Sequence, residues 1–520
     1  MKAFLIVFAV SMGIGVSQAQ IEVVKSVKLN PIENWDNFQY LSFGSEGCLA
    51  YSKKSFKGNT SIQDMMENGT FSSDIFNSNF PDWNFVSFDH NLGQVAEKQV
   101  HFETELMFNT IVKGENRVFF IYIEKWGKKG EIHTVSFPDL KTSVTPLKLR
   151  QVDVGGAVAL GNKLVFSAQN SKRFPILAQV NPSTGKTEEI DLSKYDLGKK
   201  GNVDIKRIEL INNRQMIAAH IRVAKNKSES ASHLLFLNEN GPMGKPIEIV
   251  LDGDVHPIDF STIVLGKDDF VIVGTYGVSE EVVLGTFFQR HSKGQITNSS
   301  QEFDKLEQHQ NFIKQSIEDD ERINRNTYKS NVLNAQSTDN HIFLLNKAYY
   351  VNSVYTSSSK THYKMVKDLS GTMRQEPVTE FSTEVEHNYV STHIIGTCFT
   401  LDGQNVWCEV IPIDKQIQPM DWDLYSPTIH TLDGSIVYEP VGFVMEGSSP
   451  ILVSPQGMEE INPFGNPEDL FRGASEEFIS WYDDYSLRVI LKPCSSSDEN
   501  ESDTIECGQT LQKVKVISLE

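Results

Sequence analysis

The 520-residue chain lacks the short motifs that mark the common catalytic and nucleotide-binding proteins. It has no Gly-x-Ser-x-Gly nucleophile elbow, no HExxH zinc motif, no P-loop and no GxGxxG turn. It also lacks the long helix–strand alternation of an α/β-hydrolase domain. These absences argue against a serine hydrolase, a zinc peptidase and a nucleotide-dependent enzyme.

Basic residues are in the minority. The chain has 48 Lys and Arg against 68 Asp and Glu, which gives a net charge of -20. Such a surface repels nucleic acid and anionic membranes, so we expect neither as a partner. The acidic excess itself is typical of a soluble protein surface.

Long apolar runs are lacking too, apart from one at the start of the chain. Residues 3–16 are apolar, follow the positive Lys2 and precede the small residues of Ser17-Gln18-Ala19. This pattern predicts a secretory signal peptide over residues 1–19, with the mature chain beginning at Gln20. The run is too short to span a bilayer, and no other run reaches that length. We therefore expect export to the periplasm, the cell surface or the medium, with a retained N-terminal anchor as the alternative.

Cysteine is scarce, with five residues in all. Cys398 and Cys408 flank a predicted hairpin turn, and Cys494 and Cys507 flank a polar, acidic loop. In an exported protein each pair is expected to form a disulfide, which leaves Cys48 as a buried thiol. Five reduced cysteines are the alternative, and no Cys/His spacing fits a zinc site.

The chain does contain a repeated pattern of short strands. Residues 155–192 predict four antiparallel strands separated by polar turns, which is the size of one propeller blade. Gly185, Gly241 and Gly294 lie in successive turns of this kind, about 50 residues apart, within the propeller range. The sequence therefore predicts an all-β fold, a β-propeller of four-stranded blades, with seven as the favoured number and eight as the other. A β-sandwich is the alternative.

The two ends of the mature chain predict how this propeller closes. Residues 21–29 and 511–519 both alternate apolar and polar side chains, as half-buried strands do. Pairing them in one sheet would remove an exposed edge. Residues 20–520 are thus expected to form a single domain.

One segment, residues 301–325, interrupts the strand pattern. It has no Gly or Pro and is rich in helix-forming residues. Phe303, Leu306, Ile313 and Ile317 fall on one face of the predicted helix. We expect a helix inserted between two blades, whose apolar face either packs on the rim of the propeller or binds a partner.

The repeat pattern resembles that of secreted β-propeller proteins, and the resemblance covers nearly all of the mature chain. The signal segment ending in Gln18-Ala19-Gln20 is similar to those of exported proteins from Bacteroidetes-type bacteria. The resemblance concerns architecture alone, because the motifs of WD40, kelch and sialidase-like propellers are absent. It therefore implies a fold and no set of catalytic residues.

The densest cluster of ionisable residues is Asp252-Gly253-Asp254-Val255-His256, with Asp259 close by. Oxygen ligands at alternate positions suit a hard cation, so Asp252, Asp254 and His256 are candidate ligands for calcium. The spacing does not match an EF-hand loop, and a solvated turn is the alternative. No other cofactor is indicated.

A propeller without catalytic signatures favours a non-catalytic binding or scaffold protein that recognises a protein or a glycan through its loop face. The alternative is a metal-assisted hydrolase or lyase with a carboxylate-lined site at the centre of the propeller.

Overall fold

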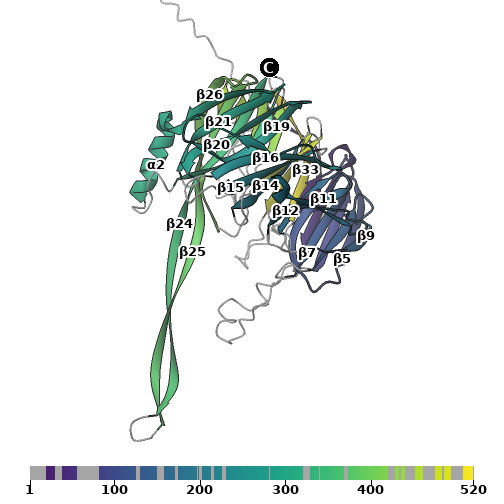
Figure 1. The fold of residues 1–520 in the computed structure, drawn as a ribbon. Coiled ribbons are helices and arrows are strands. Elements are labelled where there is room, and N and C mark those ends of the chain that lie inside the picture. Colours follow the sequence, from purple (N-terminus) through teal and green to yellow (C-terminus); the bar gives the residue numbers. More distant parts are fainter. Residues whose placement is uncertain are drawn as a thin grey trace, which may run out of the picture.

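The computed structural model describes residues 19–29, 38–54, 81–124, 129–148, 157–169, 174–195, 197, 202–211, 216–224, 230–279, 282–319, 328–338, 340–367, 373–419, 428–432, 435–439, 451–460, 475–482, 485–492 and 508–518. These residues are nearly all in β-strands (Figure 1). The predicted signal segment before residue 19, Cys494 and Cys507 lie outside them.

The described strands form eight antiparallel sheets, of which seven have four strands and one has five. The first four in chain order are β2 (Gln39–Ser42), β3 (Cys48–Lys53), β4 (Asp82–Phe88) and β5 (Gln94–His101); β6 (Met107–Lys113), β7 (Arg117–Ile123), β8 (Gly130–Ser136) and β9 (Thr142–Leu147); β10 (Ala157–Leu160), β11 (Lys163–Gln169), β12 (Pro175–Val180) and β13 (Thr187–Asp191); and β14 (Val203–Ile211), β15 (Met216–Ala224) and β16 (Ser230–Asn238), with β17 (Gly241–Pro242) and β18 (Ile247–Ile249) both paired to β16.

The other four sheets are β19 (His256–Gly266), β20 (Asp269–Ser279), β21 (Val282–Ser292) and β22 (Gln295–Glu302); β23 (Lys329–Ser337), β24 (His341–Lys367), β25 (Met373–Thr400) and β26 (Asn405–Pro419); β27 (Thr428–Leu432), β28 (Ser435–Glu439), β29 (Ile451–Ser454) and β30 (Gly457–Glu460); and β31 (Ser475–Tyr482), β32 (Tyr485–Lys492) and β33 (Gly508–Ser518) with β1 (Ala19–Leu29). The blade predicted over residues 155–192 is the β10–β13 sheet. Among the described residues the helical segments are η1 (Gly44–Glu46), η2 (Leu192–Tyr195), η3 (Phe303–Lys305) and the α-helix α2 (Glu307–Asp319).

Successive sheets stack face to face and share buried apolar clusters. On β7, Val118, Phe120 and Tyr122 pack toward the β2–β5 sheet. Phe119 and Ile121, at the alternate positions, pack toward the β10–β13 sheet. Both faces of this strand are therefore buried, which agrees with its unbroken apolar sequence. The same kind of cluster joins each of the other consecutive sheets, from the sheet that contains β1 to the β27–β30 sheet.

This arrangement of consecutive four-stranded sheets is consistent with the predicted β-propeller architecture. The sequence favoured seven blades over eight, and eight sheets are present among the described residues.

The first and last described strands pair with each other. β1 runs antiparallel to β33, with Ile21 opposite Val516 and Leu29 opposite Gln509. The predicted pairing of the two terminal segments is therefore confirmed. It completes the sheet of β31 and β32 to four strands.

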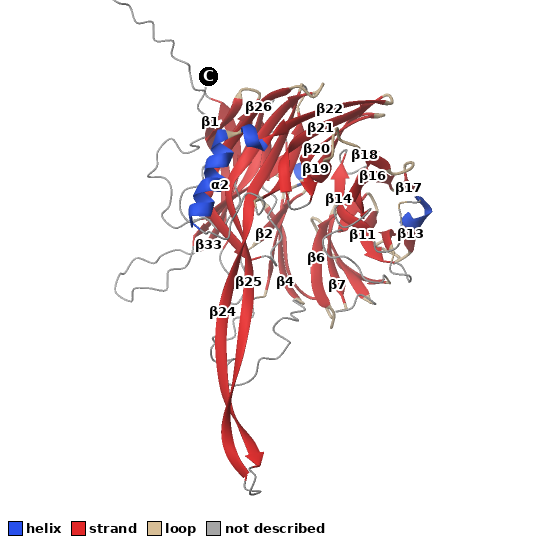
Figure 2. Ribbon diagram, turned by 60° about the vertical axis from the view of Figure 1, so that its left-hand side comes forward, coloured by secondary structure: helices blue, strands red, loops and turns tan. Residues whose placement is uncertain are grey.

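The longest strands, β24 and β25, form a hairpin that projects well beyond the sheets (Figures 1 and 2). Near its base β24 also pairs with β23, and β25 pairs with β26. Residues 353–367 of β24 and 373–387 of β25 pair only with each other within the described part of the chain, and we call them the arm.

The predicted disulfide between Cys398 and Cys408 is wrong, because both are free thiols. Cys398 lies opposite Trp407, and Thr397 opposite Cys408, so the two sulfurs are on opposite faces of the sheet. A bulge at Val406 causes this, since it shifts the register by one residue just before Trp407. Cys398 packs toward the β27–β30 sheet, and Cys408 packs into the cluster beneath α2.

Cys48, the cysteine outside the two predicted pairs, is predicted to be a buried thiol and is fully buried in the sheet of β2–β5. Burial, reinforced by the negative charge of Asp89, raises the pKa of Cys48 far above its ordinary value. This thiol is therefore protonated and packs as a small apolar side chain.

Candidate functional site

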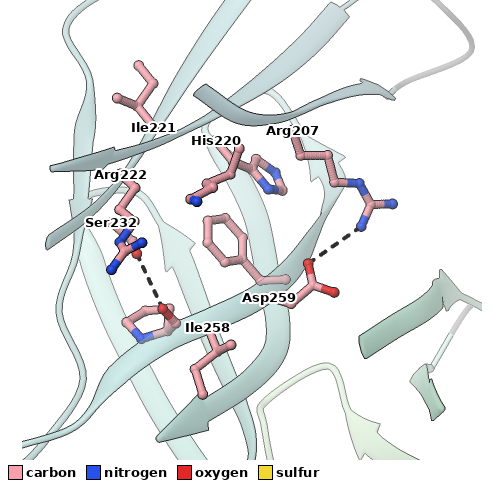
Figure 3. A pocket seen from close by; sticks show the side chains of 10 residues that line it. Arg207, His220, Ile221, Arg222, Ser232, Ile258 and Asp259 are labelled. Carbon is pink, nitrogen blue, oxygen red and sulfur yellow. Dashed lines mark hydrogen bonds and ion pairs between the residues drawn. The ribbon is translucent and has the colours of Figure 1, made fainter. Parts of the chain in front are cut away.

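A cavity of about 100 Å³ lies between the sheet of β14–β18 and that of β19–β22 (Figure 3). Its walls come from β14, β15, β16 and β19. The lining residues are Lys206, Arg207, His220, Ile221, Arg222, Ser232, Pro257, Ile258, Asp259 and Phe260.

Two β-bulges at matching positions build this cavity. On β14 the register against β15 shifts between Ile205 and Arg207. On β19 the register against β20 shifts between Pro257 and Asp259. A bulge bends its strand and redirects the side chains that follow. Here the residues that follow the bulges, Arg207 and Asp259, point toward each other in the wall of the cavity (Figure 3).

Arg207 lies between two carboxylates. Its Nη1 is 3.8 Å from Asp259 Oδ1, and its Nη2 is 3.9 Å from Glu209 Oε1. Both separations bring opposite charges together but exceed the length of a hydrogen bond. Within the described residues the Arg207 guanidinium donates no hydrogen bond.

The two carboxylates instead accept hydrogen bonds from the backbone. Glu209 Oε2 accepts from Thr262 N at 3.0 Å, which links β14 to β19. Asp259 Oδ2 accepts from Val332 N at 2.8 Å, which links β19 to β23. One oxygen of each carboxylate thus joins neighbouring sheets, and the other oxygen faces Arg207.

His220 forms part of the wall and is 3 % exposed. Its ring stacks on Phe260, with 4.1 Å between the ring centres. Its Nε2 lies 3.4 Å from Glu209 Oε2, but it has no hydrogen-bond partner. A buried ring nitrogen without such a partner is costly, which makes this atom a candidate contact for a ligand.

The two carboxylates have pKa values shifted in opposite directions. Burial alone would raise the pKa of Glu209, but contact with His220 and the charge of Arg207 hold this pKa below its ordinary value. Burial dominates at Asp259 and raises its pKa despite Arg207 and the Val332 N–H. Although protein atoms surround the carboxyl group of Asp259, 29 % of its side-chain surface is exposed, so water reaches it. Acid–base catalysts use such pairs, although carboxylates that join strands are perturbed in the same way.

The predicted calcium ligands are not brought together. Asp252 and Asp254 are exposed, in the connection before β19, and His256 is half-buried at the start of that strand. In the described ranges no group of three or more His, Cys, Asp or Glu side chains is arranged to hold a metal ion. The structure thus gives no support to a calcium site at Asp252, Asp254 and His256.

The inserted helix is present but begins later than predicted, because residues 301 and 302 still belong to β22, residues 303–305 form η3 and α2 starts at Glu307. Residues 320–325 of the prediction lie outside the described residues. Phe303 and Ile313 are buried, and Leu306 and Ile317 pack against the same cluster, which includes Tyr350 of β24. The apolar face of the helix therefore packs against the sheets of the chain itself. Of the two interpretations of its pattern, this agrees with packing and not with partner binding. The structure leaves Phe303 and Ile313 no surface for a partner.

Sequence reasoning noticed Asp259 but missed Arg207, Glu209 and His220. These residues lie on different strands, and only the fold brings them together. No spacing in the sequence could have marked them as a group.

No protein-family model matches the chain, and no curated protein sequence matches it. Three solved structures illustrate what it is similar to. A prolyl endopeptidase is 9 % identical with a TM-score of 0.34, over 81 % of this chain and 54 % of that one, so this chain spans about half of that enzyme's length. The β-propeller domain of the Trilobed protease from Pyrococcus furiosus is 8 % identical with a TM-score of 0.32, over 87 % and 98 % of the two chains. An uncharacterized protein from Listeria monocytogenes EGD-e is 9 % identical with a TM-score of 0.34, over 86 % and 100 %.

At these scores the likeness supports no conclusion about activity or ligand. Within the described ranges, no helix has the length and apolar character needed to cross a membrane.

Proposed function

We propose that this chain is an exported, non-catalytic β-propeller protein that binds another protein through its arm. The eight sheets would be the blades of one ring, closed where β1 pairs with β33. The signal-like segment at residues 1–19 supports export. The projecting arm is the observation that carries the proposal.

The arm is a two-stranded ribbon with two open edges. Isolated two-stranded hairpins are marginally stable in water, and open edges invite another strand. Addition of an extended segment to such an edge is a common mode of protein recognition. Glycans lack the backbone N–H and C=O groups that pair with a strand edge, so a protein partner is favoured.

The charges of the two edges differ. Residues 353–367 contain Lys360, Lys364 and Lys367 and no acidic residue. Residues 373–387 contain Glu376, Glu380, Glu384 and Glu386 with one Arg. Across the ribbon, Lys360 is opposite Glu380 and Lys364 is opposite Glu376.

Pro377 interrupts the acidic strand, because proline cannot donate a hydrogen bond to an added strand. The β24 edge has no proline between residues 353 and 367. We therefore propose that the partner adds an acidic extended segment to the basic β24 edge.

The test uses the chain from Gln20 as bait. It is mixed with the source organism's envelope and medium, and the mixture is treated with a lysine-reactive cross-linker. The expected result is a protein whose cross-links map to Lys360, Lys364 or Lys367. It should be lost when these lysines are changed to Glu, and when residues 354–386 are replaced by Asn-Gly. Partners that persist in both variants, or that cross-link only elsewhere, would overturn the proposal.

A second candidate function is acid–base hydrolysis or elimination at the cavity. It is favoured by the opposite pKa shifts of Glu209 and Asp259 beside Arg207. Cleavage of a polysaccharide or peptide that disappears in Asp259→Asn, and persists in the exposed control Asp254→Asn, would support this function over the first.

A further inference from the structure

We propose that the cavity between the β14–β18 and β19–β22 sheets binds a small oxyanion, a carboxylate or a phosphate group, with Arg207 as its main donor. This site is separate from the arm and does not depend on the function proposed for it.

The charge of the lining points to an anion. Three of the ten lining residues, Lys206, Arg207 and Arg222, carry permanent positive charge, and Asp259 is the one acidic residue among the ten. The whole chain has a net charge of -20. Among the charged residues of the lining, cations thus outnumber the single carboxylate three to one, opposite to the acidic excess of the whole chain, and this favours an anionic ligand.

The hydrogen-bonding capacity of Arg207 is unused. A guanidinium has five N–H donors in a planar fork that fits two oxygens of a carboxylate or phosphate. The neighbouring carboxylates do not fill this fork, since they lie at 3.8 and 3.9 Å and each accepts a backbone N–H. Arg207 is held in place by charge while its donors remain open to a ligand.

His220 adds a second polar group to the wall. Its Nε2 is buried and lacks a hydrogen-bond partner. The stacking on Phe260 fixes the ring, so this nitrogen is already in place before a ligand arrives.

The volume limits the size of the ligand. About 10–15 Å³ of water-accessible space is enough to hold one water, so about 100 Å³ holds several waters. One carboxylate or phosphate group fits this space, either as a free ion or as one group of a larger molecule whose remainder stays outside.

Titration calorimetry with two probes, inorganic phosphate and malonate, at constant ionic strength tests the proposal. We expect saturable binding of at least one probe, and which of the two binds more tightly distinguishes phosphate from carboxylate ligands. Arg207→Met should weaken binding about tenfold or more, the value expected for loss of charged hydrogen bonds.

The matched control is Arg117→Met, because Arg117 lies on β7 in another sheet, and it should bind like the original chain. Arg207→Lys keeps the charge but not the fork, so it should fold normally and still bind more weakly. Equal binding by the original chain and both Arg207 variants would overturn the proposal. So would the absence of saturable binding to either probe at about 10 mM, a concentration at which even weak specific sites fill.

Discussion

Asp259 on β19 accepts a hydrogen bond from the backbone N–H of Val332 on β23, with 2.8 Å between Oδ2 and N. Glu209 on β14 makes the equivalent bond to Thr262 on β19. Each of these carboxylates joins the first strand of its sheet to the first strand of the next. The same two side chains flank Arg207, so the links between sheets and the cavity are built from shared residues.

We predict that Asp259→Ala destabilises the protein by about 1–3 kcal/mol, because it leaves the Val332 N–H without an acceptor. Asp259→Asn keeps an oxygen at this position and should cost less. Urea unfolding of the two variants checks this. Equal losses would show that the hydrogen bond to Val332 is not what stabilises the contact.

Gly274→Ala should also destabilise the protein and distort the cavity. Gly274 lies opposite Phe260, and a Cβ there would overlap the backbone carbonyl of Asp259. The strand that carries the bulge would have to move, at a cost of about 1–3 kcal/mol. Gly266→Ala is the control, because its Cβ would meet nothing closer than 3.8 Å. Thermal unfolding should separate the two variants clearly, and similar melting temperatures would argue against the crowding at Gly274.

A histidine pair predicts acid sensitivity beneath α2. His309 Nδ1 and His393 Nε2 are 2.8 Å apart, and both rings are buried. Burial lowers the pKa of His309 to about 4, and burial together with the His309 charge lowers the pKa of His393 as well. Between pH 6.5 and 4 the unfolded chain therefore binds protons that the folded chain does not. Stability should be unaffected above pH 6.5 and fall as the pH drops toward 4, by about 3 kcal/mol for His309 alone.

The measurement for this pair is the unfolding midpoint at several pH values. His309→Gln should flatten its pH dependence, whereas the exposed control His101→Gln should not. A slope that is unchanged in His309→Gln would mean that other groups cause the acid sensitivity.

Cys398 and Cys408 should remain unlinked even in the oxidised protein, because they lie on opposite faces of one sheet. Burial raises the pKa of Cys398 to about 12 and that of Cys408 to about 11, so neither is a reactive thiolate at neutral pH. Alkylation after unfolding without reductant, followed by peptide mass spectrometry, should recover both as alkylated thiols. A peptide pair linked through these two residues would contradict the register of β25 and β26.

The sequence predicted well what repeats and periodicity can carry. The strand pattern over residues 155–192 indicated one four-stranded sheet, and the alternating terminal segments indicated their pairing. Both follow from the period of two along a strand.

The positions of the β-bulges could not be predicted from the sequence in the same way. Lys206, Ile258 and Val406 are ordinary strand residues, and nothing in their local sequence marks them as extra residues in one strand of a pair. One such residue separated Cys398 from Cys408, and two others formed the cavity. The arm was missed for a related reason, since a hairpin of polar and β-branched residues has the composition of a blade edge. Only the length of the pairing between β24 and β25, from His341 to Lys367 on β24, distinguishes it.

The pairing of β1 with β33 also sets an order of assembly. Leu29 lies opposite Gln509, so β1, the earliest described strand, finds its neighbour only after residues 30–508 have been made. At about 5–20 residues per second, a ribosome needs roughly half a minute to a minute and a half to make the intervening segment. During that time the intervening sheets can form one after another, while the pairing of β1 with β33 cannot. The edge of β1 that β33 later covers is therefore open to other chains until β33 has been made.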